Sequence, residues 1–160
     1  MGIQVGDRLP ELQLQVAKPG GIESVSTKDL FAGRKVVLFA VPGAFTPTCS
    51  LKHLPGFIEK AAEIRAKGID SIVCLAVNDA FVMDAWAKER GTGDAVIMLA
   101  DGSAEFTKAV GLELDGSRLG LGLRSQRYAA IIEDGVVKSL HIEEPRKLDV
   151  SSAEAILKGL

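Results

Sequence analysis

The chain has 160 residues, close to the usual size of one compact domain, and 47% of them are hydrophobic, as in ordinary folded proteins. Its net charge of -2 argues against a dedicated nucleic-acid binder, because contacts to phosphate need a basic surface. No apolar run is long enough to cross a membrane, and the first residues lack the apolar stretch of a secretory signal, so we expect a cytoplasmic protein with no membrane or nucleic-acid partner.

The chain shows no repeat, low-complexity tract or flexible linker, so residues 1–160 are predicted to form a single domain. The first part, residues 5–27, has a loose pattern broken by Pro10 and Pro19, and we interpret it as edge strands and turns. Short continuous apolar runs, which are typical of buried parallel strands, follow at Val36–Val41, Ile72–Val77 and Val96–Ala100.

Helical patterns alternate with these strands. Apolar residues recur at helical spacing over Cys49–Lys67, and Gly68 is placed to end that helix as a C-cap. Asn78 and Asp79 are predicted to cap a second helix, and a short third helix is predicted over Glu105–Val110.

The last part of the chain begins with a hairpin signal. Asp134-Gly135 favours a tight turn, and it separates two apolar runs at Tyr128–Ile132 and Val136–Ile142. A final helix is predicted over Ser152–Leu160, because Ser151 and the acidic residue three positions later resemble a capping box.

The order of these elements predicts the fold class. Strands that alternate with helices indicate right-handed crossovers and a mostly parallel sheet, to which the closing hairpin adds antiparallel strands. We therefore expect an α/β protein with a central mixed sheet flanked by helices, in the element order of a thioredoxin-like fold with an N-terminal extension. Such a fold does not by itself define a function.

The chemistry-bearing candidate is a cysteine. With only 2 cysteines and 2 histidines scattered along the chain, a disulfide scaffold or a zinc site is not indicated. Cys49 lies where a predicted strand passes into a predicted helix, and unpaired N–H groups and the helix dipole at that position favour the nucleophilic thiolate. Judged on residue type alone, a free cysteine is equally an inert packing residue.

Two neighbours of Cys49 fit the same interpretation. Thr46 lies one helical turn earlier, and its hydroxyl can hold a small oxygen-containing substrate beside the sulfur as donor and acceptor. Pro42 fixes the backbone of the loop and is expected to shield the sulfur from bulk water. Donors that converge on a water-poor pocket stabilise charge as an O–O bond stretches.

A family resemblance makes this pattern specific. Pro42, Thr46 and Cys49 match the Pro-x-x-x-Thr-x-x-Cys signature of the peroxiredoxins. The longer strings that contain and follow this signature are similar to the type II, or peroxiredoxin-5-like, branch, and the similarity covers nearly the whole chain. These strings are Pro42–Ser50, His53–Gly56, Cys74–Val82 and Arg124–Tyr128.

The resemblance implies roles for the residues. Cys49 would be the cysteine that attacks the peroxide, Thr46 the hydroxyl partner of the substrate, and Arg127 the arginine of the active site. Spacing alone does not choose between Arg124 and Arg127, and without the resemblance a surface salt bridge is the simpler interpretation of Arg127. His53, one helical turn after Cys49, would orient Arg127 or the loop, although a lone helical histidine is more often a packing residue.

Cys74 lies inside an apolar strand, where an inert thiol is the favoured interpretation. Some type II relatives have a resolving cysteine near the C-terminus, but residues 148–152 contain none here. The resemblance therefore implies an external thiol as reductant, with glutathione and glutaredoxin the first candidate and thioredoxin the second. No metal, haem or flavin motif is present, so no bound cofactor is expected.

The function expected is a thiol peroxidase that reduces hydrogen peroxide and alkyl hydroperoxides through a sulfenic acid at Cys49. A disulfide oxidoreductase of the thioredoxin type is the competing enzyme, but Thr46 stands where its first cysteine belongs. A non-catalytic redox sensor on the same fold is the alternative from another class. The resemblance also implies a homodimer, with Phe45 and the loop before it as candidate contacts.

Overall fold

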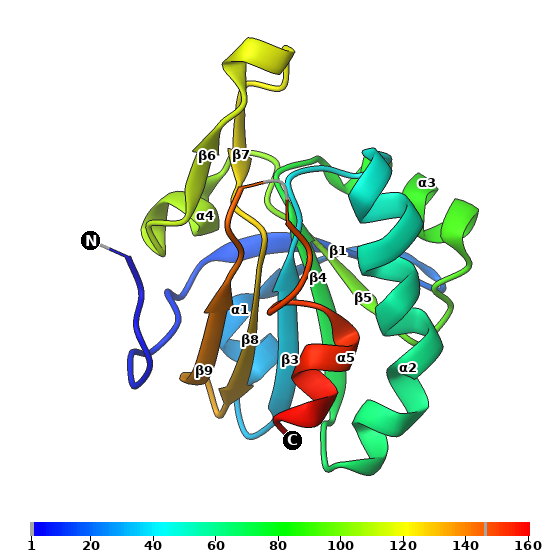
Figure 1. The fold of residues 1–160 in the computed structure, drawn as a ribbon, viewed down its shortest axis with the longest axis vertical. Helices are drawn as coiled ribbons and strands as arrows, with labels where there is room; N and C mark the ends of the chain where they lie inside the picture. The colour runs from blue at the N-terminus through cyan, green and yellow to red at the C-terminus, as the bar shows by residue number, and fades with distance from the viewer. Residues whose placement is uncertain (1, 146) are drawn as a thin grey trace.

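The computed structural model describes residues 2–145 and 147–160. Its centre is a seven-stranded sheet in the order β2-β1-β5-β4-β3-β8-β9 (Figure 1). The strands are β1 (Gln13–Lys18), β2 (Gly21–Ser26), β3 (Lys35–Ala40), β4 (Ser71–Ala76), β5 (Ile97–Ala100), β8 (Tyr128–Glu133) and β9 (Val136–Ile142).

The sheet is mixed, as predicted. Strands β3, β4 and β5 run parallel to one another in its centre, and β8–β9 and β1–β2 add antiparallel pairs on either side. The parallel strands are continuous apolar runs because helices cover both faces of the sheet. The prediction of edge strands and turns over residues 5–27 is confirmed in part, because β2 lies at the edge of the sheet whereas β1 lies between β2 and β5. The turn of the β8–β9 hairpin is the predicted Asp134-Gly135 pair.

Two apolar layers hold the helices to the sheet (Figure 1). On one face pack α2 (Leu54–Ala66), α3 (Ala80–Arg90) and α5 (Ala153–Lys158), over side chains such as Phe39 and Met98. On the other face pack α1 (Thr27–Phe31) and α4 (Glu105–Ala109), over side chains that include Leu38 and Leu75. Within the described residues, no helix has both the length and the apolar character that crossing a membrane requires.

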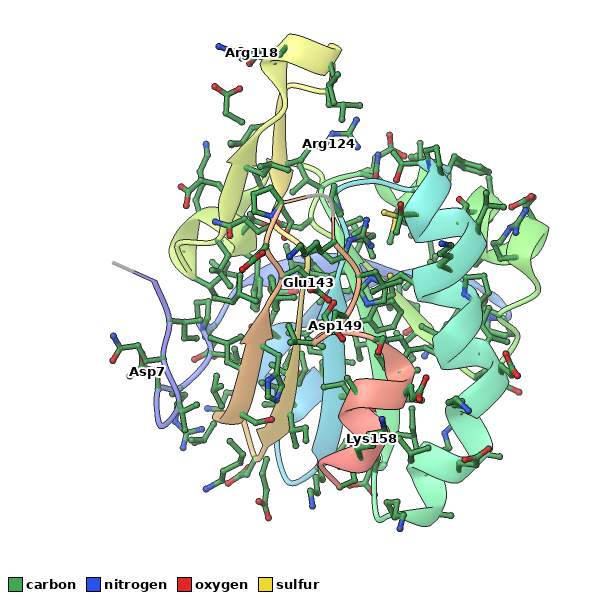
Figure 2. All side chains as sticks on the ribbon, in the orientation of Figure 1. Asp7, Arg118, Arg124, Glu143, Asp149 and Lys158 are labelled. Carbon is green, nitrogen blue, oxygen red and sulfur yellow. The ribbon has the colours of Figure 1, made fainter. Side chains whose placement is uncertain are left out.

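A second, two-stranded sheet stands apart from the main sheet. It pairs β6 (Glu113–Asp115) with β7 (Leu123–Ser125), and the 3-10 turn η2 (Ser117–Leu119) forms its tip (Figure 1, yellow). Arg118 lies at the tip and Arg124 at the base, where the arm meets the body of the protein (Figure 2). The sequence reasoning predicted neither this arm nor α1, because their short segments carry no periodic apolar pattern.

The helix predicted over Cys49–Lys67 is not uniform. Its first residues form a π-helical turn, η1 (Cys49–His53), in which the amide of Leu54 donates to the carbonyl of Cys49 five residues earlier. Regular α-helix begins only at Leu54. The wider turn buries Cys49, Ser50 and His53 together, a placement that periodicity analysis cannot anticipate.

Two predicted helix caps are also wrong in part. Asp79 caps α3 by accepting from the amide of Val82, whereas Asn78 accepts a hydrogen bond from the amide of Ala44 instead. For α5 the cap is Ser152, whose hydroxyl accepts from the amide of Ala155. Ser151 is not the cap, because its amide and hydroxyl both donate to Glu143.

Candidate active site

The candidate site lies at the carboxyl end of β3, where the chain leaves the sheet through the loop Val41–Thr48. The loop is held at its first residue and near its middle. The amide of Val41 donates to the carbonyl of Leu75, and the amide of Ala44 donates to the side-chain oxygen of Asn78 at 2.9 Å. The end of β4 thus fixes the path of the loop that leads to Cys49.

Cys49 is the first residue of the π turn and has no exposed surface. The helical turn around it is tied to the preceding loop by a bond from the amide of Ser50 to the carbonyl of Thr46, at 2.8 Å. A guanidinium nitrogen, Nη2 of Arg127, lies 3.1 Å from the Cys49 sulfur and donates to it. A positive charge and the start of a helix therefore meet at one buried sulfur.

Arg127 reaches this sulfur because of strand pairing. It directly precedes β8, and Tyr128 at the start of that strand pairs with Ala40 at the end of β3. Arg127 therefore lies at the point where β3 ends and the loop that leads to Cys49 begins. Arg124 goes elsewhere: its Nε donates to the carbonyl of Leu121 and its Nη1 to the carbonyl of Pro42, at 3.3 Å.

His53 is buried beside Arg127, with 1% of its surface exposed, and its ring packs at a tilt against the rings of Phe39 and Phe57. Its Nε2 lies 2.9 Å from the carbonyl oxygen of Ser151, and its Nδ1 lies 2.7 Å from Nη1 of Arg127. A carbonyl only accepts and a guanidinium only donates, so the imidazole carries its proton on Nε2. Burial and the nearby charge of Arg127 lower the pKa of His53 to about 3, which keeps the ring neutral.

Thr46 and Pro42 lie in the loop before Cys49, and both are half-buried. The hydroxyl of Thr46 donates to the carbonyl of Gly43 at 2.7 Å, so its proton is committed within the chain and its lone pairs remain as acceptors. A Cβ at Gly43 would come within 2.6 Å of the Arg124 guanidinium, so a larger residue there would displace that side chain. Pro42 contributes its carbonyl to Arg124.

Sequence reasoning missed the residues that hold the π turn from the side of α3. The indole nitrogen of Trp86 donates to the hydroxyl of Ser50 at 2.8 Å, and Arg90 donates to the carbonyl of Ser50 at 2.9 Å. Trp86 stood out only as an apolar residue on a predicted helix, and Arg90 carried no signal. Both become visible only when α3 is packed beside the turn.

Cys74 lies on β4 and is completely buried in the same apolar layer as Cys49. Burial raises the pKa of the Cys74 thiol well above its usual value, and the neighbouring Cys49 adds to the rise. Both cysteines are free thiols. Cys74 is therefore held as the protonated, weakly reactive form.

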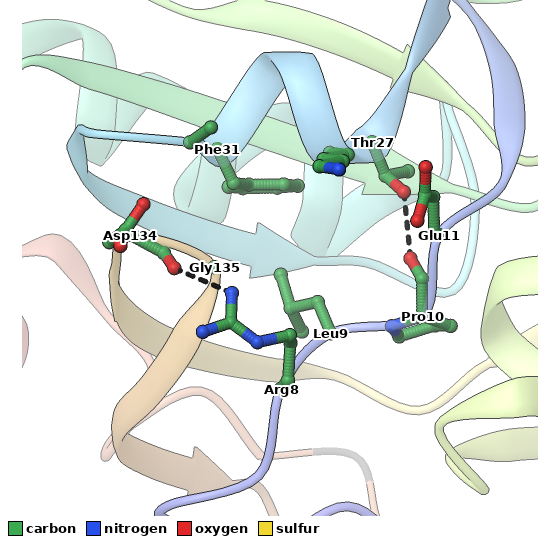
Figure 3. Close-up of a pocket in the computed structure, with 10 residues that line it drawn as sticks. Arg8, Leu9, Pro10, Glu11, Thr27, Phe31, Asp134 and Gly135 are labelled. Carbon is green, nitrogen blue, oxygen red and sulfur yellow. Dashed lines mark hydrogen bonds between the residues drawn. The ribbon is translucent and has the colours of Figure 1, made fainter.

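A pocket of about 330 Å³ lies far from this site, at the opposite end of β3 (Figure 3). Polar groups along its wall bond within the chain: Arg8 donates to the carbonyl of Asp134, and Thr27 to the carbonyl of Pro10. Neither cysteine nor histidine is among the described residues that line it. No group of three or more metal-ligating side chains occurs in the described part of the chain either.

Comparison with known proteins gives one consistent result. Residues 4–157 match the family model described as Redoxin. The chain is 57% identical to Peroxiredoxin-2E-2, chloroplastic, of Oryza sativa subsp. japonica, covering 99% of this chain and 72% of that one. It is 48% identical to Peroxiredoxin-2B of Arabidopsis thaliana, covering 99% and 98%. A crystal structure of reduced Prx3 in complex with hydrogen peroxide, from Vibrio vulnificus, is 52% identical with a TM-score of 0.93 and 98% coverage of both chains.

A thioredoxin-like α/β sheet with a cysteine at a strand-to-helix junction defines a class of thiol redox proteins, and the fold prediction is confirmed. Within that class, the chain belongs to the type II branch of the peroxiredoxin family and is a thiol peroxidase.

Proposed function

We propose that Cys49 attacks hydrogen peroxide and small organic hydroperoxides, with Arg127 and Thr46 holding the substrate. The observation that carries this assignment is the 3.1 Å contact between Arg127 and the Cys49 sulfur. The thiolate attacks one peroxide oxygen, the O–O bond breaks, and Cys49 becomes a sulfenic acid. The second oxygen leaves as hydroxide or alkoxide and takes up a proton to form water or an alcohol.

Thr46 and Arg127 have different roles toward the substrate. The lone pairs of the Thr46 hydroxyl accept from the O–H group of the peroxide, because the hydroxyl's own proton is engaged with Gly43. Arg127 stabilises the thiolate before attack and the leaving oxygen as negative charge moves onto it. Pro42 keeps its predicted role as a shield of the sulfur against bulk water.

The assignment is tested with paired cysteine variants. Cys49→Ser should abolish peroxide consumption, and Cys74→Ser should leave it near the level of the parent protein. Consumption of peroxide by Cys49→Ser at the parental rate would exclude the mechanism.

We infer that an external thiol, glutathione followed by glutaredoxin, returns Cys49 to its starting form. Support comes from Cys74, whose fully buried, protonated thiol is a poor partner for a disulfide. The sulfenic acid condenses with glutathione to give a mixed disulfide and water, and glutaredoxin then takes over the glutathione. Thioredoxin is the competing reductant.

Mass spectrometry after peroxide treatment separates these routes. With glutathione present, Cys49 should carry one glutathione, and peroxide turnover should need glutaredoxin. A Cys49–Cys74 disulfide, or equal turnover with thioredoxin alone, would contradict this route.

The predicted cytoplasmic location stays a prediction.

We also propose that the protein forms a homodimer through the face around the active-site loop. Three large apolar side chains, on the loop, on the π turn and at the start of α3, have half or more of their surface exposed: Phe45 (50%), Leu51 (67%) and Phe81 (78%). Sedimentation should give the mass of two chains for the parent protein and of one chain for Phe45→Glu. A parent protein that sediments as a single chain at micromolar concentration would contradict the dimer.

A further inference from the structure

Arg127 is held by a closed ring of hydrogen bonds that begins and ends on this one residue. Its Nη1 donates to Nδ1 of His53 at 2.7 Å, and Nε2 of His53 donates to the carbonyl of Ser151 at 2.9 Å. The amide and hydroxyl of Ser151 donate to one carboxylate oxygen of Glu143, at 2.9 and 2.7 Å. The amide of Glu143 then donates to the backbone carbonyl of Arg127 at 2.9 Å.

Every bond of this ring points in the same direction, from donor to acceptor. Five hydrogen bonds join the four residues of this ring. It fixes Arg127 at two ends, because one contact holds the backbone and another holds the guanidinium. The other guanidinium nitrogen, Nη2, is thereby aimed at Cys49.

Glu143 is the anionic member of the ring and the one that organises the loop between β9 and α5. It is buried, with 8% of its surface exposed, and its carboxylate also accepts from the amide of Asp149 at 2.5 Å. Glu143 and Asp149 lie next to each other over this loop in Figure 2. Although burial alone raises the pKa of Glu143, the hydrogen bonds from Asp149 and Ser151 outweigh it and lower the pKa, so the group stays a carboxylate.

We propose that Glu143 is a positioning residue of the peroxidase site. Through the loop that ends at Ser151 and the imidazole of His53, it holds the guanidinium of Arg127 against the sulfur of Cys49. Without the carboxylate, the Ser151 carbonyl is no longer fixed, the imidazole loses its set orientation, and Arg127 is free to leave the sulfur. Glu143 itself touches neither the sulfur nor the substrate, so it acts only through Arg127.

The inference rests on the proposed roles of Cys49 and Arg127, and its test distinguishes a failure of the role of Glu143 from a failure of those two roles. The key variant is Glu143→Gln, which keeps the size of the side chain but removes its charge. Its matched control is Glu144→Gln, because Glu144 is the exposed next residue and pairs with Lys147 at the surface. Arg127→Gln is measured in parallel.

Two readouts go beyond simple stability. The first is the pH midpoint of the Cys49 thiolate, followed by its ultraviolet absorbance with Cys49→Ser as background. The second is the rate constant for reaction with hydrogen peroxide. Glu143→Gln should move the midpoint to higher pH and slow the reaction about tenfold, the low end of what removing such outer partners costs at metal sites. Glu144→Gln should match the parent protein in both.

The nitrogen chemical shifts of the His53 ring give a third readout. The parent protein should show a single neutral tautomer with the proton on Nε2, and Glu143→Gln should show a mixture of tautomers. A Glu143→Gln variant with a lower melting temperature but an unchanged midpoint, rate and tautomer would overturn the inference, because its role would then be structural only.

The parallel variants sort the remaining outcomes. If Arg127→Gln changes the midpoint and Glu143→Gln does not, only the inference about Glu143 fails. If neither variant changes the midpoint, the proposed role of Arg127 fails together with the inference about Glu143. Should Glu143→Gln not fold, Ser151→Ala decides: it removes one of the bonds to Glu143, and a midpoint that stays at the parental value would overturn the proposal.

Discussion

Arg127 serves two acceptors with one side chain, the sulfur of Cys49 and the imidazole of His53. A planar guanidinium presents several donors in a fixed fork and reaches both acceptors at once, whereas an ammonium is a compact charge without that fixed geometry. The choice of arginine over lysine at this position therefore follows from the geometry of the site rather than from charge alone.

Arg127→Lys should accordingly keep the charge and lose the function. We expect the rate constant for hydrogen peroxide to fall by about 100-fold, because the donor at the developing negative charge is lost or misplaced. Stopped-flow kinetics with saturating reductant measure this rate. Arg124→Lys is the control, since Arg124 donates its hydrogen bonds among the described residues to backbone carbonyls and should change the rate far less.

Thr46 offers a second test at the scale of one residue. Thr46→Val keeps the shape of the side chain but removes the acceptor for the peroxide and the bond to Gly43. The loss of one hydrogen bond to a reacting group costs ~2 kcal/mol, which is about a 30-fold lower rate. Thr46→Ser restores the hydroxyl and should restore most of the activity, and an inactive serine variant would argue against this role.

Among the elements, the π turn that carries Cys49 depends on its neighbours. Trp86 and Arg90 of α3 both bond to Ser50 in the second position of the turn. A five-residue turn has too few bonds of its own to be rigid, so its order comes from these outside contacts.

Trp86→Phe tests this dependence. The change keeps an aromatic ring in the core but leaves the buried Ser50 hydroxyl without its donor, which costs ~1–3 kcal/mol of unfolding free energy. Hydrogen exchange should accelerate at residues 49–53 more than in the sheet. Arg65 also donates to backbone carbonyls, but away from this turn, so Arg65→Gln should leave exchange at 49–53 unchanged.

The elements also show how far the sequence leads. The parallel strands and the hairpin at Asp134-Gly135 were predictable, because continuous apolar runs and turn residues are local signals. The π turn, the arm of β6 and β7, and the transfer of the cap from Ser151 to Ser152 were not. Each depends on a contact that no local sequence pattern marks, as when Glu143 takes both donors of Ser151.

The candidate site divides in the same way. Cys49, Thr46 and Pro42 lie within eight consecutive residues, so a local motif was enough to find them. Arg127 was found through a resemblance, and only the pairing of β8 with β3 explains why it and not Arg124 faces the sulfur. Glu143 had no signal at all, because a lone glutamate near a loop is usually a solvated surface residue.

For the molecule as a whole, the neutral, buried His53 ties folding to pH. Its pKa is about 3 in the folded protein, against 6.5 when it is exposed in the unfolded chain. Between these two pH values the unfolded chain binds a proton at His53 and the folded protein does not. The stability that is present above pH 6.5 is therefore lost as the pH falls.

That residues 1–160 form one domain stays a prediction, and a single unfolding transition would support it.

Denaturant unfolding at several pH values measures this linkage. One proton contributes a slope of at most ~1.4 kcal/mol per pH unit below pH 6.5. His53→Gln should flatten the slope by about that amount. His141→Gln is the matched control, since His141 is the exposed second histidine, and it should leave the slope as it is. Equal slopes in all three proteins would show that His53 does not contribute.

The complete burial of Cys49 has a practical consequence for anyone who probes this thiol with chemical labels. A bulky probe reaches the sulfur only after the turn around it unfolds locally. The labelling rate therefore reports how often that turn opens and not the reactivity of the sulfur. Small oxidants and large probes will therefore rank the same set of variants in different orders.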